Sequence, residues 1–115
     1  MNKLFSCFTG IFALAVAVFA MGNLHAQTTD YRVDVGAVTL STGQTGNNYA
    51  TINRGTVNGG RLNNQSTGTV NTLILNSGTV SNAGTIGDAT QNGGTATNSG
   101  TIDSATINGG IFGAG

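Results

Sequence analysis

Residues 68–83 read GTVNTLILNSGTVSNA, and this 16-residue phrase is repeated along the second half of the chain. Residues 84–99 read GTIGDATQNGGTATNS, and residues 100–115 read GTIDSATINGGIFGAG. An earlier copy, ATINRGTVNGGRLNNQST at residues 50–67, is two residues longer. Self-similarity at a short fixed period is typical of stacked repeats, in which each unit packs on its neighbours. The stretch therefore predicts a solenoid.

Aligning the four copies brings apolar residues into columns. Ile52, Val70, Ile86 and Ile102 form the first column, and Leu62, Val80, Ala96 and Phe112 form the second. A third column contains Val57, Leu75 and Ile107 and is interrupted by Gln91. We expect the large apolar residues of the first two columns, Phe112 included, to form the core.

Two further columns consist of asparagine. The first contains Asn58, Asn76, Asn92 and Asn108, and the second contains Asn64, Asn82 and Asn98. When equivalent residues stack, asparagine side chains can hydrogen-bond to each other along the stack. The glycine column of Gly60, Gly78, Gly94 and Gly110 suits sharp corners, because glycine accepts positive φ angles. A structural role accounts for both kinds of column.

The composition of each copy favours short strands. Thr, Val and Ile are strand-forming residues, while Gly, Asn and Ser favour turns. Strand alternation would place the Thr and the Val of each Gly-Thr-Val phrase on opposite faces. No copy shows the apolar spacing of a helix. We therefore predict an all-β fold, a parallel β-solenoid (β-helix) of about four rungs over residues 50–115, of either handedness.

Residues 1–26 read MNKLFSCFTGIFALAVAVFAMGNLHA and have the features of a secretory signal peptide. Lys3 provides the positive charge of the N-terminal region, and an apolar run follows it. Leu24-His25-Ala26 ends in the small residue that a cleavage site requires. The alternative is a retained membrane anchor. Ser6, Thr9 and Gly10 interrupt the apolar run, and no basic cluster follows it.

Residues 27–49 do not fit the repeat. Tyr31, Val33 and Val35 alternate with charged residues, as in a strand with one polar face. A polar, glycine-rich stretch follows at residues 41–48. Because the first rung of a solenoid exposes a strand edge, terminal units are usually atypical. We expect residues 27–49 to be an N-terminal cap or a lead-in strand.

Once residues 1–26 are removed, the chain has few groups that could carry out chemistry. No Cys, His, Lys, Glu, Trp, Pro or Met remains, and three arginines stand against four aspartates. A histidine base, a cysteine nucleophile, a lysine and N- or S-ligated metal sites are therefore missing. We expect neither an enzyme nor a cofactor, and the slightly acidic balance disfavours a nucleic-acid partner.

Three more specific functional sites remain as alternatives: a catalytic carboxylate pair, a calcium site and an ice-binding surface. Asp88 and Asp103 lie in neighbouring copies, one column apart, so a carboxylate pair of the glycosidase kind or a calcium site is conceivable. Solvated turn aspartates explain them more simply. Thr69, Thr85 and Thr101, together with Thr79 and Thr95, form columns like those on the flat faces of ice-binding solenoids, but only residues 95–97 supply a Thr-x-Thr pair.

The repeats also resemble a family of exported proteins. Residues 93–100 and 105–110 are similar to the Gly-Gly-rich repeats of bacterial autotransporter adhesin passengers, and residues 76–86 are similar to repeats of filamentous haemagglutinin-like secreted proteins. The resemblance implies a β-helical passenger at the cell surface, the outer membrane or outside the cell. We therefore expect an exported structural or adhesive protein that acts in cell attachment or surface structure. The alternative is a secreted solenoid that binds ice or a small ligand. We expect the partner to be a host surface or matrix component, or further repeats of the same kind, which includes end-to-end self-association. A membrane would be met only during export.

Overall fold

The computed structural model describes residues 26–114 and contains nine strands. The predicted signal peptide at residues 1–26 therefore lies outside the described residues, apart from Ala26. The strands are β1 (Gln27–Tyr31), β2 (Val35–Ser41), β3 (Gln44–Asn48), β4 (Thr51–Asn64), β5 (Thr69–Asn82), β6 (Thr85–Gln91), β7 (Thr95–Asn98), β8 (Thr101–Ile107) and β9 (Ile111–Ala114). Within residues 26–114, no helix is long and apolar enough to cross a membrane.

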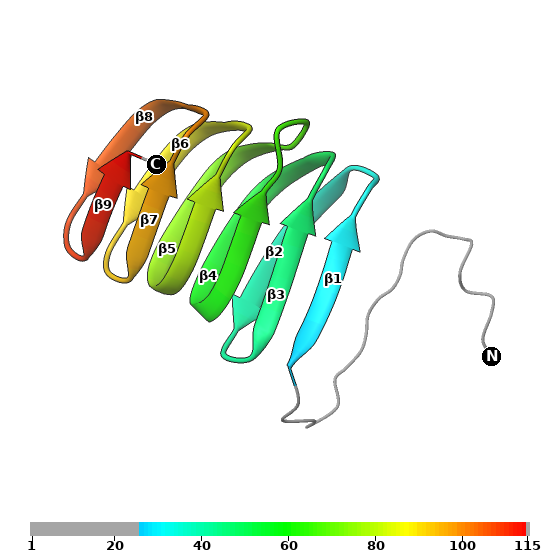
Figure 1. The fold of residues 1–115 in the computed structure, drawn as a ribbon, viewed down its shortest axis with the longest axis horizontal. Coiled ribbons are helices and arrows are strands. Elements are labelled where there is room, and N and C mark those ends of the chain that lie inside the picture. The colour runs from blue at the N-terminus through cyan, green and yellow to red at the C-terminus, as the bar shows by residue number, and fades with distance from the viewer. Residues whose placement is uncertain (1–25, 115) are drawn as a thin grey trace.

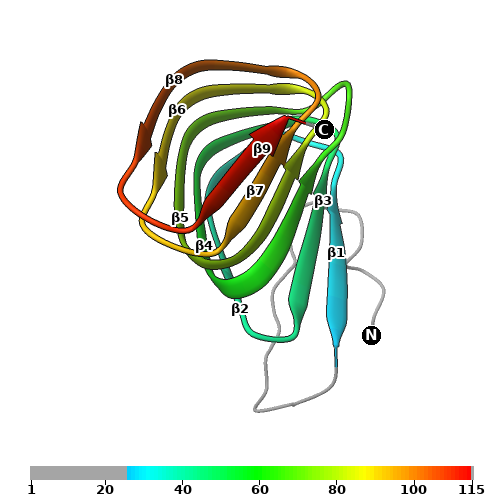
Figure 2. The same ribbon diagram turned by 60° about the vertical axis from the view of Figure 1, so that its left-hand side comes forward.

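The strands coil into a parallel β-solenoid with a period of about 16 residues and about six turns. Every strand pairing is parallel, and each strand pairs with its equivalent one turn away. Figure 1 shows the turns side by side in chain order, and Figure 2 shows β8 and β6 as successive arcs, with β9 and β7 on the facing side. The predicted fold class is confirmed.

The number of turns is larger than the predicted four, because residues 27–48 also lie in the solenoid. Val35 of β2 pairs with Ile52, and Gly46 of β3 pairs with Leu62. β1 pairs in turn with β3. Gly46 and Thr29 occupy a column that contains Leu62 and Val80 in later turns, so the sequence pattern does not reveal these early turns.

The apolar columns predicted from the sequence stack in the predicted order. Ile52 pairs with Val70, Val70 with Ile86, and Ile86 with Ile102. The column that starts at Leu62 is equally continuous through Val80 and Ala96 to Phe112. The alignment missed a further buried column of Val38, Gly55, Leu73 and Ala89, which Gly55 interrupts.

Most of the predicted core residues are buried. Ile52, Val70, Ile86, Leu62 and Val80 are almost inaccessible to solvent. Ile102 is half-buried and packs against this core. The core position predicted for Phe112 is wrong, because its side chain is 42% exposed. β9, which carries Phe112, has β7 as its one strand neighbour among the described residues, so nothing there covers its second side.

Glycine forms one corner in five successive turns. Gly43, Gly59, Gly78, Gly94 and Gly110 have positive φ angles, which side-chain-bearing residues rarely adopt. In the longer copy this conformation falls on Gly59 rather than on the predicted Gly60. At Gly78 a Cβ atom would also collide with the carbonyl oxygen of Gly60 in the turn before. These corners therefore require glycine for both conformation and space.

Candidate functional site

The asparagine column predicted at residues 64, 82 and 98 forms a hydrogen-bonded row inside the solenoid, which we call the inner ladder. Nδ2 of Asn64 donates to Oδ1 of Asn82 at 2.7 Å, and Asn82 donates to Asn98 at 2.7 Å. Asn82 Nδ2 also lies 3.2 Å from the carbonyl oxygen of Gly84 and 3.0 Å from that of Thr101. The inner ladder therefore joins corners of successive turns.

The inner ladder begins one turn earlier than the sequence predicts. Asn48 donates to Oδ1 of Asn64 at 2.8 Å and is completely buried. Asn48 belongs to residues 27–49, which do not match the repeated phrase, so the alignment does not include it. The sequence signal that could have found it is the 16-residue spacing from Asn48 to Asn64, which equals the spacing from Asn82 to Asn98.

The second predicted column forms a row on the surface, which we call the outer ladder. Asn108 donates to Asn92 at 2.9 Å, Asn92 to Asn76 at 2.8 Å, and Asn76 to Asn58 at 2.8 Å. These amides donate toward the N-terminal end of the stack, whereas the inner ladder donates toward the C-terminal end. All four residues are exposed, so water can replace any of these bonds.

A shorter row near the N-terminal end was not predicted. Asn63 donates to Asn47 at 3.0 Å, and Asn47 donates to the Asp30 carboxylate at 3.0 Å. The last acceptor of this row is thus an ionised group, which accepts a stronger hydrogen bond than an amide oxygen does. This row adds side-chain hydrogen bonds to the backbone pairing of β1 with β3.

Gln91 is the polar member of an otherwise apolar column, and it is buried. Its Nε2 donates to the carbonyl oxygens of Gly94, at 3.1 Å, and of Ile111, at 2.9 Å. Its Oε1 is buried without a hydrogen-bond partner. Ala89 and Ala96 leave a small cavity beside it, because they replace the larger Leu73 and Val80 of the turn before. Gln91 thus holds the last turn through hydrogen bonds rather than through apolar packing.

The two candidate aspartates lie in neighbouring turns and in different columns. Asp88 and Asp103 are both exposed, and Asp88 is paired across the strands with Ser104. Within residues 26–114, no group of three or more His, Cys, Asp or Glu side chains is arranged to hold a metal ion.

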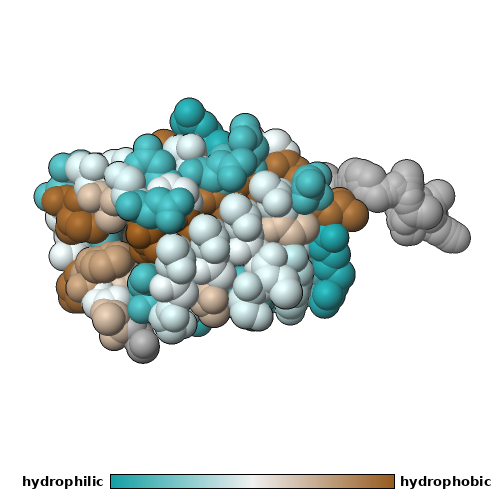
Figure 3. All heavy atoms as spheres, turned by 90° about the horizontal axis from the view of Figure 1, so that it is seen from above, coloured by the Kyte–Doolittle hydropathy of each residue, from teal (hydrophilic) through white to brown (hydrophobic). Residues whose placement is uncertain are grey.

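The structure contains both predicted threonine columns. One is continuous but only one threonine wide, and the other is interrupted. Thr51, Thr69, Thr85 and Thr101 pair in sequence over four turns. Thr79 and Thr95 also pair, but Arg61 precedes them and Ile111 follows them in the same column. Figure 3 shows that residues of intermediate hydropathy cover much of this view of the stack. The surface is regular along the axis, with hydroxyl and amide groups repeating at each turn.

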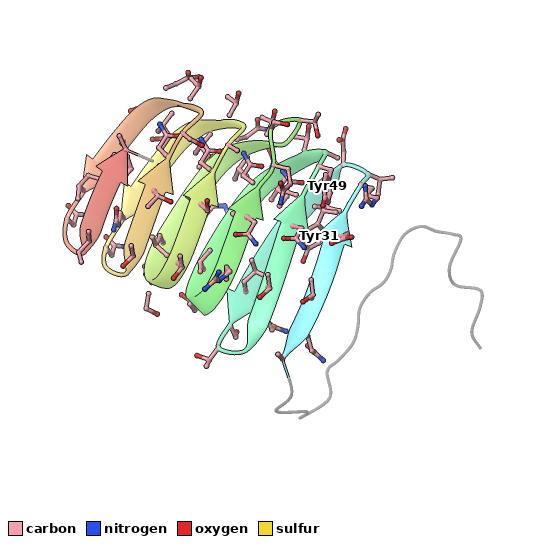
Figure 4. All side chains as sticks on the ribbon, viewed as in Figure 1. Tyr31 and Tyr49 are labelled. Carbon is pink, nitrogen blue, oxygen red and sulfur yellow. The ribbon has the colours of Figure 1, made fainter. Side chains whose placement is uncertain are left out.

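The aromatic residues of the described chain lie mainly at its N-terminal end. Figure 4 shows Tyr31 and Tyr49 close together beside β1 and β3. The guanidinium of Arg32 lies over the Tyr49 ring, 4.1 Å from its centre, and forms a 3.4 Å ion pair with Asp30. Burial raises the pKa of the Tyr31 hydroxyl, while a hydrogen bond with Thr29 acts in the opposite direction. This end therefore combines aromatic and charged contacts.

The chain matches no protein-family model, no curated protein and no solved structure in the three comparisons made. What is established is a parallel β-solenoid with asparagine ladders.

Proposed function

We propose that the chain is an exported structural or adhesive protein, which acts in cell attachment or surface structure by displaying its solenoid at a bacterial surface. The observation that carries the proposal is the repetition of the outward-facing polar groups. The outer ladder and the column from Thr51 to Thr101 each present the same kind of group over four successive turns. The resemblance of the repeats to adhesin passengers supports the same function.

Such a surface favours many weak contacts over one tight contact. Tight protein interfaces usually depend on a cluster of Trp, Tyr or Arg anchors. Here Arg54 and Arg61 are exposed on the side of the stack, while Tyr31 and Tyr49 lie together at one end. Attachment through the repeated polar groups would therefore gain strength from the number of displayed copies. Neither a catalytic step nor a cofactor belongs to this proposal.

Export is tested separately from attachment. If residues 1–26 are a signal peptide, mass spectrometry of the exported protein should find Gln27 at the N-terminus. Recovery of the full-length chain in the cytoplasm alone would contradict export and, with it, the proposed surface role.

Attachment is tested by comparing purified chain with chain displayed as a dense array on cells or beads. We expect retention on host cells or matrix by the array and little retention of the single molecule. A variant that replaces both Thr85 and Thr101 with lysine changes the repeated surface, and Asp34→Asn serves as a control at the end of the stack. Tight binding of single molecules to one soluble ligand would contradict the avidity mechanism.

The threonine column from Thr51 to Thr101 favours a second candidate function, which is ice binding. An ice binder acts as a single molecule through flat rows of threonine, so array display would not be needed. Thermal hysteresis of the purified chain that disappears in the Thr85→Lys/Thr101→Lys variant would favour this candidate over the adhesive one. We expect no hysteresis, because the row is one threonine wide over these four turns.

A further inference from the structure

Every Asn-Gly pair in the chain belongs to the outer ladder. The sequence contains three such pairs, at residues 58–59, 92–93 and 108–109, and their asparagines are three of the four members of that row. No asparagine of the inner ladder precedes a glycine. An exposed asparagine followed by glycine readily loses its side-chain amide, because glycine has no side chain to hinder attack by its own backbone nitrogen. The outer ladder therefore combines a reactive sequence with exposure.

Two of these pairs lie in turns rather than in strands. Asn92 and Gly93 follow the end of β6 and precede β7. The backbone nitrogen of Asn92 donates to the carbonyl oxygen of Leu75 at 2.7 Å, whereas the nitrogen of Gly93 lies 3.4 Å from the same oxygen. The second hydrogen bond is long and weak, so little stabilisation is lost when the Gly93 nitrogen attacks the neighbouring side chain. Asn108 and Gly109 occupy the equivalent place between β8 and β9.

The third pair is held more firmly by the backbone. Asn58 and Gly59 lie within β4, where Asn58 pairs with Ser77 of β5 and both residues pair with Ser41 of β2. Neighbouring strands on both sides restrict the backbone rotation that attack by the Gly59 nitrogen requires. We therefore expect Asn58 to react more slowly than the two asparagines in turns.

We propose that Asn92 and Asn108 are sites of spontaneous deamidation in the folded chain, at a rate that the hydrogen bonds of the outer ladder limit. At the first site the Gly93 nitrogen bonds to Cγ of Asn92 and the Cγ–Nδ2 bond breaks. The side-chain nitrogen leaves as ammonia, taking up the proton that the Gly93 nitrogen loses. Water then opens the succinimide ring to aspartate or isoaspartate. Each site consumes one water and releases one ammonia, and the reaction does not depend on the proposed surface role.

The product breaks the ladder on one side of the modified residue and keeps it on the other. Nδ2 of Asn92 donates to Asn76 at 2.8 Å, and a carboxylate cannot replace this bond because it has no hydrogen to donate. Its oxygens still accept from Asn108, whose amide lies 2.9 Å from Oδ1 of Asn92, and an ionised acceptor strengthens that bond. Reaction at both sites places two negative charges about 5 Å apart, where they repel each other. Deamidation therefore turns a neutral amide row into an acidic one.

Peptide mapping by mass spectrometry tests the assignment on the full chain, kept folded in mildly alkaline buffer. Asn92 and Asn108 should convert before any other asparagine. Asn71 is the matched control, because it is also exposed and donates to an asparagine one turn away at 3.2 Å, but it precedes Thr72. Conversion of Asn71 as fast as that of Asn92 would overturn the proposal. Conversion of Asn92 only after the chain is unfolded in urea would also overturn it.

Two substitutions of Asn76 test whether the ladder limits the rate. Both remove the hydrogen bond that Asn76 donates to Asn58, but Asn76→Ala also removes the acceptor of the Asn92 amide, whereas Asn76→Asp keeps one. Conversion of Asn92 should be about five-fold faster in Asn76→Ala than in Asn76→Asp, which is the rate equivalent of one exposed hydrogen bond. Asn108, whose bond to Asn92 is unchanged, should convert equally fast in both. Equal conversion of Asn92 in two variants that keep their circular dichroism would overturn the role of the ladder.

Discussion

At the scale of single residues, the two asparagine ladders place the same side chain in very different surroundings. Asn82 is 1% exposed, while Asn92 is exposed on the surface. Each donates a hydrogen bond to an asparagine one turn away and accepts one from an asparagine on the other side. A buried polar group that loses its partner pays the full cost of desolvation, whereas an exposed group can turn to water. The inner ladder should therefore matter far more for stability.

Asn82→Ala should lower the free energy of unfolding by about 3 kcal/mol, because it removes the buried acceptor of the Asn64 amide and the buried donor to the carbonyl oxygen of Gly84. Asn92→Ala, the matched control on the outer ladder, should cost less than about 1 kcal/mol. Urea unfolding followed by circular dichroism measures both. Equal losses would show that burial does not separate the two ladders.

Tyr31 should make stability sensitive to alkaline pH. Burial raises the pKa of its hydroxyl above the ordinary value of 10.0. The neutral form is thus favoured in the folded chain, and the unfolded chain loses the proton first as the pH rises. The contribution is fully present below pH 10.0 and is lost as the pH rises toward the pKa of the folded state.

Tyr31→Phe removes this ionisation, so its unfolding free energy should fall less between neutral and strongly alkaline pH than that of the unchanged chain. The ultraviolet absorbance of tyrosinate reports the ionisation directly. Identical alkaline dependence of the two proteins would contradict the assignment to Tyr31.

At the scale of elements, strand alternation and the glycine corners together fix each turn. Ile86 of β6 lies completely buried between Val70 and Ile102, and Thr85, one residue earlier, is half-buried. Gly78, in the middle of β5, turns the chain with a φ angle of 95°. A change at either kind of position should act on the whole turn, since each strand pairs with the turns before and after it.

Ile86→Asp should destabilise the chain by several kcal/mol, on the order of 4, because it places a carboxylate in an apolar interior without a partner. Thr85→Asp points the same group outward and should be tolerated. Circular dichroism and thermal unfolding compare the two variants. The alternation would be wrong if both lost their strand signal to the same degree.

Gly78→Ala should cost more than about 2 kcal/mol, because a residue with a Cβ is strained at positive φ and its Cβ would meet the backbone of Gly60. Gly36→Ala is the control, since its Cβ would have open space. That substitution should be neutral or should stabilise the chain by up to about 1 kcal/mol. Urea unfolding of the two variants tests the difference, and equal behaviour would argue against the corner geometry.

Much of this element structure could be predicted from the sequence, because equivalent residues lie a fixed distance apart. The column from Ile52 to Ile102 and the outer ladder follow from the alignment of four copies alone. The buried column of Val38, Leu73 and Ala89 could not be found in this way, since Gly55 and Ala89 hide its apolar character. Whether a side chain is buried depends on the turns that cover it. The exposure of Phe112 therefore could not be predicted from its column alone.

At the scale of the whole molecule, the early turns show the limit of a repeat-based prediction. Residues 27–48 pair in register with later turns although they lack the repeated phrase. Their register is set by backbone pairing and by a few residues such as Leu40 and Asn48. Stacking tolerates such drift in sequence, because each turn contacts only its neighbours. For the same reason, the turns at the two ends of the stack differ from the inner turns, because each has a neighbouring turn on one side only among the described residues.

The central claim is that successive turns stack in chain order, so that equivalent residues are neighbours. Methyl-labelled NMR tests it directly on the column of Ile52, Val70, Ile86 and Ile102. Adjacent turns lie about 5 Å apart, and residues two turns apart lie about 10 Å apart. We predict strong nuclear Overhauser contacts from Ile52 to Val70, from Val70 to Ile86 and from Ile86 to Ile102. Strong contacts between Ile52 and Ile86, with none from Val70 to either, would contradict the solenoid.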